Sequence, residues 1–393
     1  MRFVESEANP GGGAPLLLLV VLCGLGASGW ASAGAPQTAG SPEPAALEVP
    51  SRLTLDSFRT LDAPCYDRSA QPQTAVVDTH VHFRPFGGPA VPFEEVLEYF
   101  EATGVLFANV YGIGQMLPAS SSCTYYLDCP GTPVTPTLKN DFVNAANVVA
   151  KTPAGLHLTL AMTFPNLAEP DSILAGMELL DAEYPGLFRW MGEVNLAKQA
   201  LFDNGHEPVP PETIAKWGGF MQVLRERGIP LAIHADLGND DDPTRYLPLM
   251  EEVLRRYPDN AIVWVHMGLS RELTTMDPAR HVALMTSMLE RHPKLMLDIA
   301  WRVIDDAYFS TPEGREAYVP FLNAYPERIL PGTDFLASRD KDLEVYREEL
   351  EVTGRVHRLL DDEAFRNIAL GENYFRLLGL EYKAPPVCRG ESR

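Results

Sequence analysis

Eight short apolar runs alternate with longer amphipathic segments from residue 76 onward. The segment from Pro210 to Gly228 is typical of the amphipathic ones, because it begins with prolines and ends at a glycine, as helices commonly do. Strand–helix alternation repeated eight times predicts an α/β fold, a (β/α)8 barrel of the TIM type. The expected strands are Val76–His82, Val105–Tyr111, Leu158–Phe164, Phe188–Val194, Pro230–Ala235, Ala261–His266, Leu295–Ala300 and Ile329–Asp334.

The pattern also divides the chain into segments. We expect the barrel domain over residues 74–382, where extra helices follow the eighth strand. Residues 34–73 are interpreted as a flexible spacer and lead-in, because their first part is rich in Pro, Ala and Gly. Residues 383–393 are left as a short tail.

The first 33 residues have the features of an export signal. The apolar run LLLLVVLCGLG precedes the small residues Ala31-Ser32-Ala33, and it is too short to span a membrane comfortably. We therefore expect a periplasmic or secreted protein. Only Arg2 is basic ahead of the run, so a cytoplasmic protein with no working signal is the alternative.

The chain is acidic, with 53 Asp and Glu against 32 Lys and Arg and a formal net charge of −21. Such a surface repels phosphate backbones, which argues against nucleic-acid binding. Neither a G-x-x-x-x-G-K phosphate loop nor a G-x-S-x-G nucleophile turn occurs within the predicted fold. A small-molecule substrate is the expected partner, and the sequence predicts no oligomeric state.

Four cysteines follow the predicted signal. Cys123 and Cys129 lie in one Pro/Ser-rich stretch, whereas Cys65 precedes the first strand and Cys388 follows the last helix. A closed barrel brings its ends close together, and export would place the chain in an oxidising compartment. We therefore predict the pairs Cys65–Cys388 and Cys123–Cys129, with unpaired cysteines in a cytoplasmic protein as the alternative.

The strongest local motif is VVDTHVHF, in the first predicted strand. Residues two apart in a strand point to the same face, so His80 and His82 project together into the barrel and converge on one metal ion. Their apolar neighbours Val76 and Val81 fit poorly with the alternative, two surface histidines on an edge strand. Asp78 shares this face one pleat deeper, where we expect it to hydrogen-bond a ligand.

Four further strands end in a side chain that can bind a metal: Glu193, His234, His266 and Asp334, on the fourth, fifth, sixth and eighth strands. Taken singly, a core histidine or a capping aspartate is the commoner interpretation. A buried carboxylate, however, must be paired, hydrogen-bonded or metal-bound. Because barrel active sites lie at the carboxyl ends of the strands, all six side chains together predict a metal centre.

The remaining histidines are not expected at this centre. His157 stands at the amino end of the third strand, and His206 is more simply a loop histidine, although it could reach substrate. Three others lie in helical stretches and are expected to be solvated: His281, His292 and His357.

Two other features fall on the catalytic side of the predicted barrel. The irregular stretch of residues 112–136, between the second and third strands, is a candidate lid. Three arginines follow strand ends by a few residues: Arg271, Arg302 and Arg339. One of them is a candidate for binding a substrate carboxylate, although solvent exposure is the commoner reading of each.

The order His-x-His, Glu, His, His, Asp over eight strands resembles the amidohydrolase superfamily of metal-dependent hydrolases. The closing sequence ALGENYFRLLGL, with Asn373, Arg376 and Gly379, is similar to the final helix of the amidohydrolase-related group, which includes aromatic-acid decarboxylases. The resemblance covers residues 74–382 and identifies no substrate.

The resemblance implies one divalent ion with His266 as a second ligand or a catalytic hydrogen-bonding group. Many members carry a carboxylated lysine where this chain has Glu193, and a glutamate can bridge two ions, so one and two ions both stay open. Nitrogen and carboxylate ligands suit Zn²⁺ best, with Mn²⁺ and Fe²⁺ as alternatives. The implied ligands of the one ion are His80, His82, His234 and Asp334.

The resemblance further implies hydrolysis of an amide, ester or lactone by a metal-activated water. Asp334 would take the proton of that water, and His266 would polarise the carbonyl or donate to the leaving group. Two alternatives remain. The same site would also suit decarboxylation of an unsaturated or aromatic acid, or the barrel would be catalytically idle and serve in binding.

Overall fold

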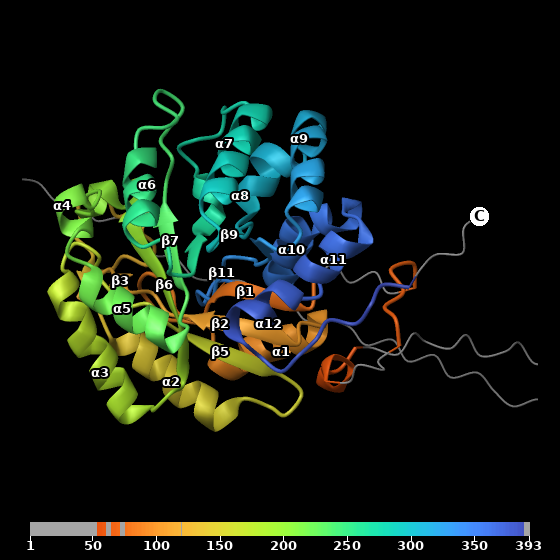
Figure 1. The fold of residues 1–393 in the computed structure, drawn as a ribbon. Helices are drawn as coiled ribbons and strands as arrows, with labels where there is room; N and C mark the ends of the chain where they lie inside the picture. Colours follow the sequence, from red (N-terminus) through yellow and green to blue (C-terminus); the bar gives the residue numbers. More distant parts are fainter. Residues whose placement is uncertain (1–52, 60–63, 71–74, 119, 389–393) are drawn as a thin grey trace, which may run out of the picture. The chain divides into compact units, whose positions relative to one another are not determined.

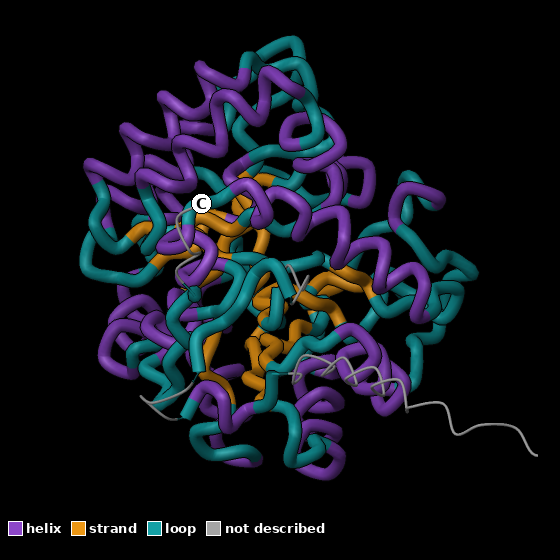
Figure 2. The backbone as a smooth tube through the Cα atoms, turned by 90° about the vertical axis from the view of Figure 1, so that its right-hand side faces the viewer, coloured by secondary structure: helices purple, strands orange, loops and turns teal. Residues whose placement is uncertain are grey.

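Nine parallel strands form the central sheet of the computed structural model, which describes residues 53–59, 64–70, 75–118 and 120–388 (Figure 1). The strands lie at the centre and helices surround them (Figure 2). In hydrogen-bonded order the strands are β10 (Ile329–Leu330), β9 (Leu295–Asp298), β8 (Ile262–Trp264), β7 (Leu231–Ala235), β6 (Phe188–Ala197), β5 (His157–Met162), β2 (Phe107–Tyr111), β1 (Val77–His82) and β11 (Phe335–Leu336). The predicted export signal and much of the predicted spacer lie outside the described residues.

The eighth strand is split, and its two halves close the barrel. β10 pairs with β9, whereas β11 pairs with β1, so the last strand joins both edges of the sheet. Between the halves, the Asp334 amide donates to the His80 carbonyl at 2.8 Å. A β-carbon at Gly332 would lie 2.8 Å from the His80 β-carbon, so a glycine there allows this close approach. The predicted TIM-type barrel is confirmed, with the expected last strand interrupted after Leu330.

Helices connect successive strands as predicted: α1 (Phe93–Thr103), α2 (Lys139–Lys151), α3 (Ile173–Glu183), α5 (Gly218–Arg227), α6 (Leu247–Arg256), α7 (Pro278–Arg291) and α9 (Pro312–Ala324). The stretch from Pro210 is divided into α4 (Pro211–Ile214) and α5, and α5 ends at Gly228 in the left-handed conformation typical of a helix stop. Helices also follow the eighth strand: α10 (Leu343–Gly354), α11 (Asp362–Ile368) and α12 (Glu372–Leu378). None of the helices in the described part of the chain has the length and apolar character to cross a membrane.

The prediction that the helical histidines are solvated is wrong for two of them. His281 and His357 are almost completely buried, and only His292, at the end of α7, is partly exposed. The ring of His281 donates to the Met267 carbonyl (3.0 Å) and accepts from the Tyr318 hydroxyl (2.7 Å). A histidine on an amphipathic helix is therefore accommodated inside when both ring nitrogens find partners, which the sequence pattern does not reveal.

The predicted disulfide Cys65–Cys388 is present, and it joins residues 323 positions apart. Beside it the Cys388 amide donates to the Tyr66 carbonyl at 2.9 Å. The segments that precede the first strand and follow the last helix therefore lie side by side, as the closed barrel requires.

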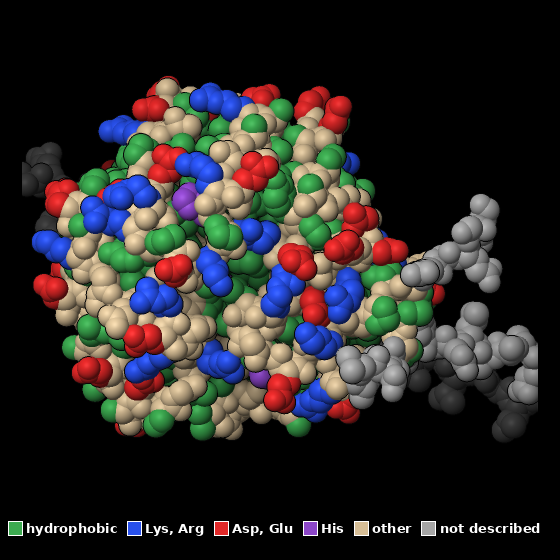
Figure 3. All heavy atoms as spheres, viewed as in Figure 1, with side chains coloured by type: hydrophobic (Ala, Val, Ile, Leu, Met, Phe, Trp, Pro, Cys, Tyr) green, Lys and Arg blue, Asp and Glu red, His purple; other side chains and the backbone are tan. Residues whose placement is uncertain are grey.

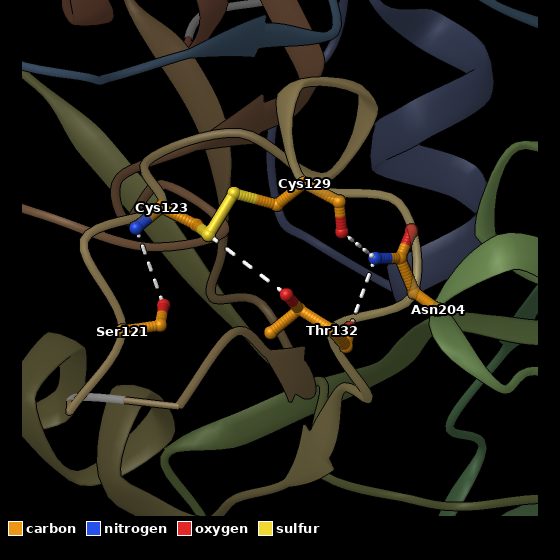
Figure 4. Close-up of a disulfide and its surroundings, with 5 residues drawn as sticks. All are labelled: Ser121, Cys123, Cys129, Thr132 and Asn204. Carbon is orange, nitrogen blue, oxygen red and sulfur yellow. Dashed lines mark hydrogen bonds between the residues drawn. A yellow bond between two sulfur atoms is a disulfide. The ribbon is translucent and has the colours of Figure 1, made fainter. Parts of the chain in front are cut away.

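The second predicted disulfide, Cys123–Cys129, is also present and closes a short loop of the 112–136 stretch (Figure 4). The side-chain amide of Asn204 donates to the carbonyls of Cys129 and Thr132, at 2.9 Å each. Asn204 belongs to η4 (Gln199–Asn204), just after β6, so the loop is fixed to the carboxyl end of the barrel.

Acidic and basic side chains are interspersed over the face of the molecule drawn in Figure 3. Lys and Arg side chains gather into no broad patch on that face. This distribution suits a chain whose excess of acidic over basic residues is spread along the sequence.

Candidate metal centre

The two histidines of β1 turn their Nε2 atoms toward each other, 3.2 Å apart. The other nitrogen of each ring is held by an acceptor: His80 Nδ1 donates to Asp298 Oδ2 (2.8 Å) and His82 Nδ1 donates to the Gly112 carbonyl (2.7 Å). Because a carboxylate and a carbonyl only accept, each Nδ1 carries the proton. In the neutral ring, each Nε2 therefore offers its lone pair to a metal ion.

Two carboxylates from distant strands complete this arrangement. Glu193 Oε2, from β6, lies 3.3 Å from His80 Nε2 and 3.2 Å from His82 Nε2. Asp334 Oδ1, between β10 and β11, lies 3.4 Å from His80 Nε2 and 3.2 Å from His82 Nε2. We call these four side chains the ligand quartet.

The spacing of the quartet fits a tetrahedral metal ion. Five of the six distances between its donor atoms lie between 3.2 and 3.4 Å. A tetrahedron with edges of this length has its centre about 2.0 Å from each corner, which is the distance from Zn²⁺ to an imidazole nitrogen or a carboxylate oxygen. Two nitrogens and two oxygens also form a donor set that zinc accepts.

The other two predicted ligands form a second group around Glu193. His234 Nδ1 lies 2.5 Å from Glu193 Oε1, and its Nε2 lies 2.9 Å from Asp236 Oδ1, so both ring nitrogens face carboxylates. His266 Nδ1 donates to the Ala300 carbonyl at 3.0 Å, which leaves the lone pair on Nε2. We call Glu193, His234 and His266 the second group; their donor atoms also lie within 4.8 Å of one another.

The six predicted residues therefore meet at one end of the barrel, but in two overlapping sets. The quartet contains Glu193 where the family resemblance implies His234. Which of the two holds the first ion stays a prediction.

Positive charges around Glu193 and Asp334 keep both carboxylates ionised, which is the form that binds a cation. Burial alone would raise the pKa of Glu193, but the charges of Lys198 and His234 outweigh it and hold that pKa well below its ordinary value. Burial is likewise outweighed at Asp334, whose pKa is lowered by the neighbouring histidines. Burial lowers the pKa of His266 to about 4, so its imidazole is neutral near pH 7.

Unusual backbone conformations bring three of these strand ends to the centre. His266, Trp301 and Asp334 have φ angles of 56°, 85° and 56°, in the left-handed region that residues other than glycine seldom adopt. Each such residue costs about 1–3 kcal/mol and persists where surrounding contacts hold it. Such residues cluster at active sites.

Asp78 supports the centre differently from what we expect. Its carboxylate accepts from the Thr333 amide (3.0 Å) and hydroxyl (2.7 Å), the Tyr346 hydroxyl (3.1 Å) and the His80 amide (3.2 Å). Burial raises its pKa to about 6. Asp78 therefore joins the backbone of β1 at His80 to Thr333, in the turn between β10 and β11. The expected hydrogen bond to a ligand residue is present, but it is made with the His80 amide and not with the imidazole.

Three residues at the centre are absent from the sequence-based set. Asp298 ends β9 after a run of apolar residues, the same signal that marks the other strand ends. Asp236 follows His234 by two positions and shares its face, a weaker signal of the same kind. Lys198 directly follows the Leu196-Ala197 end of β6, but a lysine at a strand end is ordinarily expected to be solvated. Its buried ammonium donates to Glu193 Oε1 at 2.7 Å.

A pocket of about 350 Å³ opens over the centre. The candidate lid contributes Thr124, Tyr125, Tyr126 and Asp128, all within the ring closed by Cys123–Cys129. This stretch thus forms part of the pocket wall, and closure by it stays a prediction. Other lining residues include His82, Phe86, Glu193, Lys198, His234, His266, Arg271, Trp301, Arg302, Asp334, Leu336 and Lys341.

The remaining candidates divide by their position relative to this pocket. Arg271 and Arg302 line it, whereas Arg339 and His206 are not among its lining residues. His157 begins β5, at the amino end, as predicted. His206 lies in the loop after η4, as predicted, and is buried, which lowers its pKa to about 4.

Comparison with known proteins identifies the fold and a family. A family model described as amidohydrolase matches residues 77–380. A search of the curated proteins finds no match.

Several solved structures are similar. An amidohydrolase from Burkholderia multivorans with bound zinc has 12% identity and a TM-score of 0.50, over 77% of this chain and 99% of that one. Dihydroorotase from Campylobacter jejuni has 13% identity and a TM-score of 0.48, over 79% and 84%. 4-Oxalomesaconate hydratase from Rhodopseudomonas palustris has 17% identity and a TM-score of 0.45, over 77% and 95%. At 12% identity, the likeness to the Burkholderia multivorans protein is one of fold.

Proposed function

Because the chain belongs to the amidohydrolase family, we propose that it is a metal-dependent hydrolase that cleaves an amide, ester or lactone bond of a small molecule. The observation that carries the proposal is the ligand quartet, whose donor atoms are spaced for one tetrahedral cation. The pocket of about 350 Å³ above the quartet has a volume suited to a small molecule.

In this proposal His80, His82, Glu193 and Asp334 hold a divalent ion, with Zn²⁺ favoured over Mn²⁺ and Fe²⁺ by the nitrogen and oxygen donors. A bound Zn²⁺ would lower the pKa of its water to about 7 and polarise a carbonyl. A second ion would use Glu193 Oε1, which faces His234. The metal content per chain distinguishes one bound ion from two.

Asp334 is the proposed base. Its Oδ1 belongs to the quartet, its Oδ2 lies 3.7 Å from His266 Nε2, and the residue lines the pocket. A carboxylate with a strongly lowered pKa accepts a proton only from an acidified donor, such as a water next to the cation.

His266 is the proposed partner of Asp334. Since its Nδ1 proton is bonded to the Ala300 carbonyl, its Nε2 is an acceptor at neutral pH. His266 therefore acts as a second ligand or as a proton acceptor, and it can donate to a leaving group only after taking up a proton. Lys198 is a positioning residue: its ammonium donates to Glu193 Oε1, so that Oε2 faces the other donor atoms of the quartet.

The test is metal content followed by a substrate screen. Purified protein is analysed for bound metal and then assayed against lactones, amides, esters and aromatic acids, with the chelated protein as the control. The proposal predicts at least one divalent ion per chain and hydrolysis that stops on chelation. Metal-dependent release of carbon dioxide without hydrolysis would assign a decarboxylase instead, and protein that binds no metal would favour the idle barrel.

We also propose that the protein is exported. The two disulfides support this, because such bonds persist in oxidising compartments and are rare in the cytoplasm. The intact mass of protein from a periplasmic or culture fraction tests it: loss of about the first 33 residues is expected. A full-length chain recovered only from the cytoplasm would contradict export.

A further inference from the structure

The pocket contains two cations without an anionic partner. Lys198 is paired with Glu193, and Arg302 is paired with Asp306 (3.2 Å). Within the described ranges, neither Arg271 nor Lys341 has a carboxylate oxygen within 4.0 Å, although both line the pocket. In a chain of net charge −21, unpaired cations beside a candidate active site indicate that the missing anion comes from the ligand.

Arg271 lies close to the metal centre. Its guanidinium carbon is 5.6 Å from the centre of the Trp301 ring, and that ring is 5.0 Å from the ring of His266. A guanidinium beside an indole keeps its hydrogen-bonding edge available, so Arg271 can still bind a carboxylate with two parallel bonds.

Tyr126 lines the pocket wall shared by this cation and the ligand quartet. Burial raises the pKa of Tyr126 well above its ordinary value, and the charges of Arg271 and Asp334 act on the same hydroxyl in opposite directions. Tyr126, Arg271 and Asp334 line the same pocket.

Aromatic rings form much of the remaining wall. The Phe86 and Tyr126 rings meet edge to face at 4.4 Å, and Tyr125 packs on Tyr126 at 4.6 Å. Trp301 adds a further ring beside Arg271. Such walls favour a flat, apolar ligand body, because aromatic rings pack well when offset-stacked or edge to face.

We propose that the pocket binds a small, flat carboxylic acid whose carboxylate pairs with Arg271 while its body lies against the aromatic rings. The inference rests on the proposed function, since the acid is then the substrate whose scissile bond lies over the quartet. It selects Arg271 from the three arginines that follow strand ends, because Arg302 is already paired and Arg339 does not line the pocket.

The binding of benzoate and of benzamide to the zinc-loaded protein tests the inference by isothermal titration calorimetry. The two probes share a flat ring and differ in charge. We expect benzoate to bind at least about 10-fold more tightly than benzamide, and Arg271→Met to remove at least about 10-fold of the benzoate affinity. Arg271→Lys should recover part of it, because the charge returns without the two-pronged geometry. Arg339→Met is the matched control and should bind benzoate as the wild type does.

The outcomes are separable from those of the proposed function. Benzoate affinity that is unchanged in Arg271→Met would overturn the inference, since the carboxylate would then be held by the metal or by Lys341. Equal affinity for benzoate and benzamide would overturn it as well. Metal content and the hydrolysis of neutral phenyl acetate are measured on the same variants. If those two readouts persist while the benzoate effect is missing, the inference alone has failed.

Discussion

The ligand quartet and the second group share Glu193, but the rings of His82 and His234 have different partners. In the quartet, each Nδ1 of His80 and His82 donates to an acceptor outside the group, and each Nε2 faces the other donor atoms of the quartet. In the second group, both nitrogens of His234 face carboxylates. Burial lowers the pKa of His234, but Glu193 and Asp236 outweigh it and raise the pKa above its ordinary value.

The difference shows which set is ready to bind an ion. Burial is outweighed by nearby carboxylates, which raise the pKa values of His80, His82 and His234 alike, so each of them must lose a proton to bind an ion. The donor atoms of the quartet already have the spacing of a tetrahedral ion, whereas His234 Nδ1 must also give up its 2.5 Å contact with Glu193 Oε1. We therefore expect the quartet to hold the tighter ion, with any ion in the second group bound more weakly. Substitutions in the two sets test this expectation, and the largest effect is expected at a quartet histidine.

Removing a quartet histidine should have the largest effect. We expect His82→Ala to weaken metal binding at least about 100-fold and to abolish activity, because the ion loses a direct ligand. His234→Ala should still retain one ion per chain. Elemental analysis after gel filtration measures both. If His234→Ala empties the site as His82→Ala does, the set implied by the family resemblance is correct and the comparison fails.

Replacing the proposed base comes next. We expect Asp334→Asn, assayed at saturating metal, to lower kcat by about 10²–10⁴-fold, because an amide cannot take a proton from water. Circular dichroism of the variant controls for folding at this left-handed position, which asparagine tolerates. Wild-type turnover in this variant would rule out the role of Asp334.

Replacing the carboxylates that hydrogen-bond the histidine rings should have intermediate effects on metal binding. Asp298→Asn removes the charge that holds the ring of His80, and we expect it to weaken metal binding about 10–100-fold. Asp236→Asn makes the matched change behind His234 and should leave the tighter ion in place. Metal titration with a competing chelator measures both variants, and equal losses would show that the two sets act as one.

The smallest effect, on stability alone, should come from His281, which supports the turn carrying His266 through the Met267 carbonyl. Burial lowers its pKa to about 4, and the groups that face it, Tyr318 and Tyr308, are both neutral below pH 7. Its stabilising contribution is thus complete above about pH 6.5 and is lost as the pH falls through about 4.

We expect this loss to be on the order of 1–3 kcal/mol of unfolding free energy. His281→Gln should therefore show a shallower fall in stability between pH 7 and pH 4 than the wild type. Chemical denaturation at several pH values measures it, with His292→Gln, at the partly exposed end of the same helix, as the control. A wild-type slope in His281→Gln would show that another group causes the acid sensitivity.

Local patterns explain the successful sequence predictions. The period of two in β1 places His80 and His82 on one face, and apolar runs mark where each strand ends. The cysteine pairs follow because a closed barrel fixes where its ends lie. Asp298 carries the same strand-end signal and could have been included among the predicted site residues. The burial of His281 could not have been predicted from such a pattern, because its partner Tyr318 comes from another helix.

The sequence by itself determined that metal-binding side chains would meet at the carboxyl ends of five of the eight strands, because strand period and strand order are written in local patterns. Only the tertiary structure decided which atoms face which. His80 and Asp298 are 218 positions apart, and Lys198 reaches Glu193 only because the chain turns just after β6. Contacts of this kind depend on sub-ångström packing of distant segments, which the spacing of residues along a chain does not encode.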